Sequence, residues 1–372
     1  MRKSRDERNE IVFAYAYAES ERDAVARVVR ELATELRGQG MPVRVLGIPA
    51  GSIVASGGGP ADRVRRMLSE TTFLLRTVGV VFAGHRRMRA FVSVDVPSGL
   101  PLVGALARII SSGRVRDAAW VMDLYRLAAH DSGLMTKTRS AVELFALQKS
   151  GSIVTIGSCM AQTIQGLLDR QVHVIPLWHR PIERHSPVNA ELPLRLLYSG
   201  SAREVHPLRD LVAVVAERDD VELTISGSGS EVEAARRDVS GRGIGNVTIR
   251  EFAPEDELEA MYAGADLHIV SLAEELTGTC VPSKVYAAMG AGRGVFYLGS
   301  PTGQAAVDVL ASGAGVVVGT RDGASINDAL DNLVSRPKVI EEMARRSARF
   351  FDANRTIGHG AAKWAEYLVS ER

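Results

Sequence analysis

The stretch that decides the fold is Gly278-Thr-Cys-Val-Pro-Ser-Lys-Val-Tyr-Ala-Ala-Met-Gly-Ala-Gly-Arg293. Apolar runs at 266–272 and 295–298 flank it, so a strand enters a glycine-bearing loop and another strand follows. Pro282 favours the first turn of a helix, and Gly292 is typical of a helix end. Such a loop leaves backbone N–H groups free above the strand, and Lys284 in the first turn opposes the helix dipole unless an anion offsets it. The pattern predicts an anion site for phosphate.

Strand-like apolar runs alternate with helical segments along the whole chain, which predicts parallel sheets with helical crossovers. The strand-like runs are 11–17, 43–47, 90–94, 118–122, 153–156, 172–175, 194–198, 221–225, 247–252, 267–272, 295–298 and 315–318. The chain has 372 residues, more than one hydrophobic core usually organises. We therefore expect an α/β protein of two Rossmann-like domains, with ligands bound in a cleft that both sheets face.

The boundary between the domains is predicted at residues 177–193, because four prolines between Pro176 and Pro193 break both periodicities. A proline-rich connector acts as a semi-rigid spacer. The expected parts are an N-terminal domain at 1–176, the linker at 177–193, a C-terminal domain at 194–338 and terminal helices at 339–372. No strand follows these terminal helices.

Composition excludes several classes of function. The formal net charge is +1, whereas nucleic-acid-binding proteins usually carry a strong excess of positive charge. We therefore expect no nucleic-acid partner. Only Cys159 and Cys280 are present, which fits a reducing compartment. The charged N-terminus has no apolar segment of a signal peptide behind it, and no run reaches 18 uncharged apolar residues, so we expect a cytoplasmic protein.

Three tempting motifs carry little weight. The turn Ser226-Gly-Ser-Gly-Ser-Glu231 has Val232 where a dinucleotide-binding turn has its third glycine, and it follows the second strand of its domain. A nicotinamide cofactor is therefore not expected. His179, His185 and His206 have no carboxylate or cysteine at ligand spacing, and Asp219-Asp220 reads as a solvated turn, so no metal is expected.

The basic-flanked helical stretch from Arg63 to Arg89 has two interpretations. It can lie against a membrane surface, because apolar residues alternate with arginines along it. It can equally be a crossover helix of the N-terminal domain that faces the core and exposes its arginines, and the topology favours this second interpretation.

With these motifs in place, the chain resembles glycosyltransferase family 4, the nucleotide-sugar-dependent transferases of GT-B fold. The resemblance is strongest to the bacterial subgroup whose signature reads Val-Pro-Ser-Lys, an aromatic residue, a short helix and Ala-Gly-Arg. It covers roughly residues 194–335, including Leu197–Arg203 and Val295–Gly303, and it is weak in the N-terminal half, at Trp120–Tyr125 and Val174–Trp178. In this family the end of the chain crosses back onto the N-terminal domain.

The resemblance implies transfer of a sugar from a nucleotide-sugar donor to an acceptor hydroxyl, with retained anomeric configuration and without metal, cofactor or enzyme nucleophile. Arg203 and Lys284 would stabilise the departing diphosphate, since fixed donors must face its oxygens. The usual lysine partner of Arg203 is missing, because Val205 and His206 stand nearby. The donor site would comprise Gly200, Ser201, Gly227, Gly229, Phe252, Glu274, Glu275, Thr277, Gly278, Thr279, Val281, Pro282, Ser283 and Tyr286.

One departure from the family concerns the donor. Many members carry two glutamates with seven residues between them, at the positions of Thr279 and Ala287. Glu274 and Glu275 can supply the sugar contacts instead. A uridine diphosphate sugar is the first choice of donor and a deoxythymidine diphosphate sugar the second. The alternative function is a non-catalytic protein that binds a nucleotide-sugar or regulates another protein.

The acceptor is expected at loops that follow the N-terminal strands. Asp123 is the acid best placed to orient an acceptor hydroxyl, although it can also be a helix N-cap. A lipid-linked cell-surface glycan and a small natural product are both open as acceptors, and a lipid-linked one implies peripheral contact with the inner membrane face. The other acceptor residues would be Ala18, Glu19, Ser98, Gly99, Tyr125 and Arg126.

Overall fold

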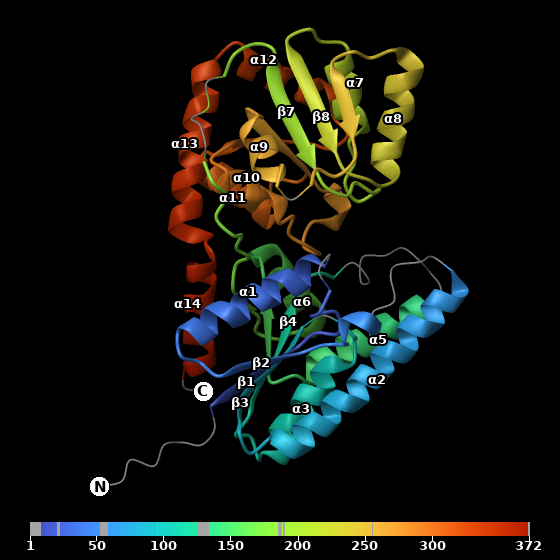
Figure 1. Ribbon diagram of the computed structural model, residues 1–372, viewed down its shortest axis with the longest axis vertical. Coiled ribbons are helices and arrows are strands. Elements are labelled where there is room, and N and C mark those ends of the chain that lie inside the picture. Colours follow the sequence, from blue (N-terminus) through green and yellow to red (C-terminus); the bar gives the residue numbers. More distant parts are fainter. Residues whose placement is uncertain are drawn as a thin grey trace. The chain divides into compact units, whose positions relative to one another are not determined.

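The computed structural model describes residues 9–20, 23–52, 59–94, 96–124, 134–184, 188, 190–254 and 256–370. The chain divides into two compact units. The first unit consists of Met1–Pro176 together with Gly360–Arg372, and the second consists of Leu177–His359. Each unit is built around one parallel sheet (Figure 1).

In the described part of the first unit, six parallel strands form a sheet in the order β2-β1-β3-β4-β5-β6. They are β1 (Glu10–Ala14), β2 (Val43–Leu46), β3 (Met88–Val94), β4 (Arg116–Val121), β5 (Ser152–Thr155) and β6 (His173–Val174). The connections carry α1 (Ala24–Gly38), the 3-10 turn η1 (Ala50–Ser52), α2 (Pro60–Gly84), α3 (Leu100–Ile110), α5 (Leu134–Lys149) and α6 (Ser158–Leu168).

Helices cover both faces of this sheet, so its central strands are apolar along their length. Figure 1 shows α1 and α14 (Ile357–Val369) on one side and α2, α3 and α5 on the other. Val12 and Phe91 pack with α2 and α3. Phe13 points to the opposite face, where its ring centroid lies 5.7 Å from that of Trp364.

Local signals set the helix boundaries. The Asp23 carboxylate accepts a hydrogen bond from the Ala26 N–H at 2.7 Å and caps α1. Pro60 occupies the first turn of α2, where a missing N–H has no intrahelical partner to lose. In the described part of the chain, α2 is the helix that is long and apolar enough to cross a membrane by length and composition. This differs from the sequence expectation, because charged residues such as Arg76 interrupt the apolar run in the sequence.

In the described part of the second unit, six parallel strands have the order β12-β11-β10-β7-β8-β9. They are β7 (Leu194–Ser199), β8 (Val221–Ser226), β9 (Val247–Arg250), β10 (Leu267–Ser271), β11 (Gly294–Leu298) and β12 (Gly315–Val318). The helical elements are α7 (Arg209–Ala216), α8 (Ser230–Arg242), α9 (Leu258–Ala263), the 3-10 turn η2 (Glu274–Leu276), α10 (Lys284–Gly290), α11 (Gln304–Ser312), α12 (Gly323–Val334) and α13 (Pro337–Asn354).

The terminal helices divide differently from the expected segment 339–372. α13 belongs to the second unit, where its Phe351 packs so closely on α10 that a Cβ atom at Gly290 would lie 3.2 Å from the ring. α14 packs on the first unit, and the ring of its Trp364 lies 4.7 Å from that of Trp120. The chain therefore returns to the first unit only with α14.

The expected linker 177–193 also belongs to the second unit rather than standing between two domains. Arg184 donates to both carboxylate oxygens of Asp352 at 2.9 and 2.8 Å and to the Gly290 carbonyl at 2.9 Å. Ile182 packs against Ala287 and Ala291. These contacts fix the proline-rich segment to α10 and α13, which prolines alone cannot reveal.

Candidate functional site

The residues of the predicted anion site lie on two loops at the carboxyl edge of the second sheet. One loop follows β7 and the other follows β10, and the two strands are neighbours. The Ala273 N–H donates to the Val205 carbonyl at 3.0 Å, and the Ser271 hydroxyl donates to the Pro207 carbonyl at 2.7 Å. The loops therefore hold each other in place before any ligand arrives.

Lys284 places a partly buried cation between these loops. Its ammonium donates to the Tyr198 hydroxyl at 3.3 Å and to the Ser201 carbonyl at 3.4 Å, and it lies 4.8 Å from the centre of the Tyr198 ring. No described carboxylate lies within ion-pairing distance of it. Burial lowers the pKa of Lys284 to about 8. A buried cation that has only neutral partners favours an anionic ligand.

Gly200 makes room for this ammonium. Its φ of +133° suits glycine, and a Cβ atom there would lie 2.3 Å from Cε of Lys284. Two further glycines allow the β7 and β8 loops to approach each other. A Cβ atom at Gly227 would lie 2.0 Å from the Gly200 carbonyl oxygen, and one at Gly229 would lie 2.1 Å from the Ala202 carbonyl oxygen. The glycines of the Ser226–Glu231 turn are thus explained by close backbone packing.

His206 and Arg203 add two basic groups to the same loop. The Nδ1 atom of His206 lies 2.6 Å from the Ser271 carbonyl and donates to it, because a carbonyl can only accept. Burial, followed by the positive charge of Lys284, lowers the pKa of His206 to about 4, although the hydrogen bond to Ser271 acts in the opposite direction. The charge of Arg203 also lowers the pKa of His206. The Arg203 side chain is exposed, and its guanidinium has no described partner. The loop therefore presents positive potential that a bound anion would relieve.

The loop after β10 offers backbone donors. No described residue accepts a hydrogen bond from the N–H of Val281, Ser283 or Lys284. Gly278 has a φ of +82°, which turns the chain before Pro282. α10 begins at Lys284, two residues after Pro282.

Acidic side chains frame this loop on its solvent side. Glu274 accepts from the Thr320 N–H at 3.2 Å, and Glu275 pairs with Arg321 at 3.2 Å. Both glutamates are exposed, as the proposed sugar contacts require. Thr277 donates its hydroxyl to the Glu274 carbonyl at 2.6 Å, which holds the turn.

The structure corrects some of the predicted donor contacts. Tyr286 is fully buried, and its hydroxyl donates to Asp308 at 2.8 Å, so it stabilises the core and cannot touch a donor. The Val281 and Thr279 side chains are also buried, and the Thr279 hydroxyl donates to the Leu276 carbonyl at 2.7 Å, so both can contribute only backbone groups. Phe252, by contrast, is 51% exposed and lies two residues beyond β9.

The predicted acceptor residues of the first unit are distributed over three loops. Ala18 is a correction, because its side chain is fully buried, and a Cβ atom at Gly47 would lie 2.9 Å from its own. Glu19 is exposed, and Ser98 and Gly99 precede α3. Asp123 lies two residues beyond β4 and is partly buried. Tyr125 and Arg126 lie outside the described residues.

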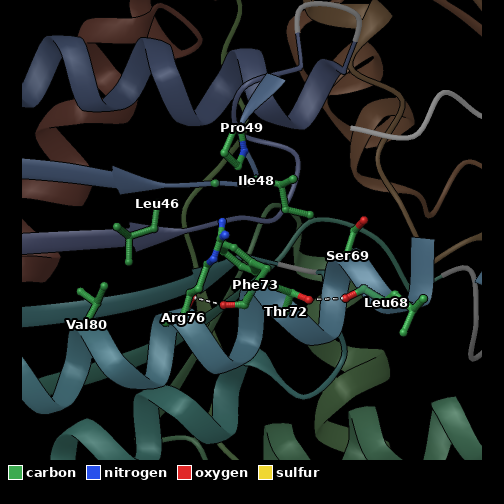
Figure 2. Close-up of a pocket in the computed structure, with 11 residues that line it drawn as sticks. Leu46, Ile48, Pro49, Leu68, Ser69, Thr72, Phe73, Arg76 and Val80 are labelled. Atoms are coloured by element: carbon green, nitrogen blue, oxygen red, sulfur yellow. Dashed lines mark hydrogen bonds between the residues drawn. The ribbon is translucent and has the colours of Figure 1, made fainter. Parts of the chain in front are cut away.

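A cavity of about 370 Å³ in the first unit was not predicted. Figure 2 shows α2 on one side of it and the loop after β2 on the other, with the Arg76 side chain reaching from the helix toward that loop. The apolar lining comes from side chains distant in sequence, so no local motif signals it. The lining residues include Leu46, Ile48, Pro49, Leu68, Phe73 and Val80.

Across the described ranges, no group of three or more His, Cys, Asp and Glu side chains is arranged to hold a metal ion. Cys159 and Cys280 are both buried, and neither takes part in a disulfide.

Residues 194–336 match the profile of the family described as "Glycosyl transferases group 1". This segment contains all of β7 to α12, and with them Gly200, Arg203, His206 and Lys284. Among curated protein sequences, none matches the chain.

Solved structures show the same fold over nearly the whole chain. A sucrose-phosphate synthase from Thermosynechococcus elongatus is similar with a TM-score of 0.72 at 16% identity, covering 97% of this chain and 98% of that one. HepE from Anabaena, in complex with UDP and glucose, has a TM-score of 0.66 at 14% identity, with 97% and 100% covered. A glycosyltransferase from Rickettsia africae has a TM-score of 0.69 at 10% identity, with 97% and 98% covered. The chain thus has the predicted GT-B fold, and its second unit carries a glycosyl transferases group 1 segment.

Proposed function

We propose that this protein is a glycosyltransferase that moves a sugar from a nucleotide-sugar donor, with a UDP-sugar favoured, to an acceptor hydroxyl. The observation that carries the proposal is the ammonium of Lys284, which is partly buried between two loops with no described carboxylate to offset it. It lies within the segment that matches the glycosyl transferases group 1 profile. Support for the donor class comes from HepE, a protein of similar fold that binds UDP and glucose.

In the proposed reaction the bond between the anomeric carbon and the β-phosphate oxygen breaks, and a bond from that carbon to the acceptor oxygen forms. Negative charge grows on the departing diphosphate, and Lys284, Arg203 and the free N–H groups at the start of α10 stabilise it. The departing phosphate oxygen takes the acceptor proton. Attack on the same face retains the anomeric configuration, and the step uses no enzyme nucleophile.

The first unit is proposed to hold the acceptor near Asp123, Ser98 and Glu19, at loops that follow its strands. The acceptor class is proposed to be a cell-surface glycan on a lipid diphosphate or a natural product with a free hydroxyl. A cytoplasmic location suits both, and two buried cysteines that form no disulfide are compatible with a reducing compartment.

A second candidate function is binding of a nucleotide-sugar without turnover. It is favoured by Thr279 and Ala287, which stand where the resembled family often has glutamates and which are both buried. Ala287 packs against Ile182 and Ala291, so apolar side chains surround the position where the family often has its second glutamate.

A thermal-shift series with UDP, dTDP, GDP, ADP and their glucose conjugates tests both functions at once. A nucleotide present at about a hundred times its dissociation constant adds roughly 2.7 kcal/mol of stability. The proposal expects the largest shift with UDP or a UDP-sugar, and then release of UDP when acceptors are added. A UDP shift without UDP release from any acceptor would favour the binding protein, and no shift with any nucleotide would contradict both.

A further inference from the structure

The helix α2 is apolar on two opposite faces. Four apolar side chains on one side of the helix are exposed: Val64 (52%), Leu68 (59%), Leu75 (69%) and Phe82 (55%). Spacings of four and seven residues place them along one side of an α-helix. We call these four residues the exposed stripe. On the opposite side Phe73 belongs to the core of the first unit. An ordinary crossover helix needs only the buried face, so the exposed stripe requires a separate explanation.

Only 17% of the most apolar part of this helix is buried, so the core of the first unit does not cover it. Figure 1 shows α2 running along the outside of that unit. At the same time Phe73, Thr77 and Val81 are buried and tie the helix to the unit along its length. A helix held in this way lies along a surface and does not cross a bilayer.

Arginines border the exposed stripe. Arg63, Arg65 and Arg76 are each next in sequence to a stripe residue and therefore lie about 100° around the helix from it. Within α2, residues 60–84 contain four arginines and two acids, and one of the acids, Glu70, accepts a hydrogen bond from the Tyr17 hydroxyl at 2.6 Å. The helix that carries the stripe therefore has a net positive charge.

We infer that α2 docks the protein on an anionic membrane surface. The exposed stripe would enter the boundary between headgroups and acyl chains, and the bordering arginines would pair with anionic headgroups. A second copy of the chain fits less well, because pairing two stripes would bring the same arginines together with too few acids on the helix to offset them. The inference does not depend on the proposed reaction.

The cavity beside α2 strengthens the choice of a lipid. Leu68 belongs both to the stripe and to the cavity lining, so the cavity opens beside the face that would meet the membrane. Arg76 also lines it, is exposed and has no described partner (Figure 2). An anionic headgroup can pair with Arg76 while apolar surface of the cavity lies within reach of a lipid chain.

Cosedimentation of the full chain with vesicles tests the inference without any donor or turnover. We expect binding to vesicles of phosphatidylcholine with phosphatidylglycerol, weak binding to phosphatidylcholine alone, and release by added salt. Replacing Leu75 and Phe82 together by glutamine should lower the partition coefficient at least about tenfold. Replacing Arg63 and Arg65 together by glutamine should lower it about tenfold.

Matched controls use exposed side chains elsewhere. Leu167→Gln on α6, where the leucine is 51% exposed, and Arg237→Gln on α8 should bind the anionic vesicles as the wild type does. Circular dichroism melting should be unchanged in all variants, because every replaced side chain faces solvent.

Three results would overturn the inference. One is a wild-type protein that stays in the supernatant with anionic vesicles at low salt. Another is a stripe variant that binds as tightly as the wild type. The third is a concentration-dependent dimer in sedimentation equilibrium that the stripe variant dissociates, which would assign the stripe to a subunit interface. None of these results bears on nucleotide binding, so the proposed function stands or falls separately.

Discussion

A Cβ atom on residue 200 would lie 2.1 Å from Nζ of Lys284, so the conformation of Gly200 and the position of the Lys284 ammonium depend on each other. Gly200→Ala should therefore displace the ammonium as well as strain a backbone with a φ of +133°. We expect a loss of about 1–3 kcal/mol in the free energy of unfolding and weaker UDP binding. Chemical denaturation and calorimetry measure the two effects.

Gly241→Ala is the matched control for this substitution. Gly241 lies near the end of α8, has no positive φ, and a Cβ atom added there would have no neighbour within 4 Å. Alanine there should stabilise the protein by about 0.5–1 kcal/mol and leave UDP binding unchanged. Equal behaviour of the two alanine variants would contradict the coupling of Gly200 to Lys284.

Lys284→Met removes the charge and keeps most of the length of the side chain. If Lys284 stabilises the departing diphosphate, transfer should fall at least about tenfold, equal to roughly 1.4 kcal/mol of transition-state stabilisation. Steady-state kinetics with a UDP-sugar decide the matter. Lys338→Met, at an exposed position on α13, should keep wild-type kinetics, and wild-type turnover in Lys284→Met would remove the assigned role.

The lowered pKa of Lys284 predicts how UDP affinity and stability depend on pH. With a pKa of about 8 in the free protein, the ammonium loses its proton as pH rises through 8, so UDP affinity should fall above that value. In the unfolded chain an ordinary lysine has a pKa near 10.4, so the unfolded state binds more protons between about pH 8 and pH 10.4. The contribution of Lys284 to the free energy of unfolding therefore rises with pH across that window.

For the same reason, Lys284→Met should be more stable than the wild type at pH 7, with a difference that shrinks above pH 8. Calorimetric titration with UDP and thermal melts from pH 6 to 10 provide both profiles. A wild-type UDP affinity that stays constant from pH 7 to 10 would show that the Lys284 charge does not hold the nucleotide.

Tyr286 is expected to affect stability and not ligand binding. Tyr286→Phe removes one hydrogen bond to Asp308, which should lower the free energy of unfolding by about 1 kcal/mol and leave UDP affinity unchanged. A large loss of UDP affinity with unchanged stability would return Tyr286 to the donor site.

Asp308 should matter more, because the Arg355 guanidinium donates to it at 2.6 Å and both side chains are buried. Asp308→Ala would leave that guanidinium without its carboxylate and should lower stability by about 3–5 kcal/mol. Glu342→Ala, which breaks solvent-facing pairs with Arg345 and Arg346 on α13, should leave stability nearly unchanged in the same denaturation assay.

The strands could be predicted from the sequence because buried parallel strands are continuous apolar runs, such as Leu267–Ser271 and Gly294–Leu298. The structural role of the proline-rich segment could not be predicted in this way. They marked an interruption of periodicity near 177–193, but the ion pair between Arg184 and Asp352 joins residues far apart in the chain. A pattern read along the sequence does not contain such a contact.

The candidate site shows the same limit. Lys284 could be predicted as a site residue because a cation at a helix start is unfavourable without an anion nearby. Its contact with Tyr198 could not be predicted, because Tyr198 lies 86 residues earlier in the chain. Tyr286 shares the signature with Lys284, and the sequence alone gives no sign that its hydroxyl meets Asp308 in the core. For α2, the crossover interpretation matches the buried side that carries Phe73, and the membrane interpretation stays a prediction.

The second unit is an insertion within the first. The chain leaves the first unit after Pro176 and re-enters it at Gly360, and the two crossings run side by side where the His179 N–H donates to the Arg355 carbonyl at 3.0 Å. During synthesis, domains commonly fold in the order in which they emerge. In this protein the core of the first unit is completed last, because Trp364 of α14 packs in it beside Phe13 and Trp120. The unit that emerges first from the ribosome must wait for its last helix until the other has been made.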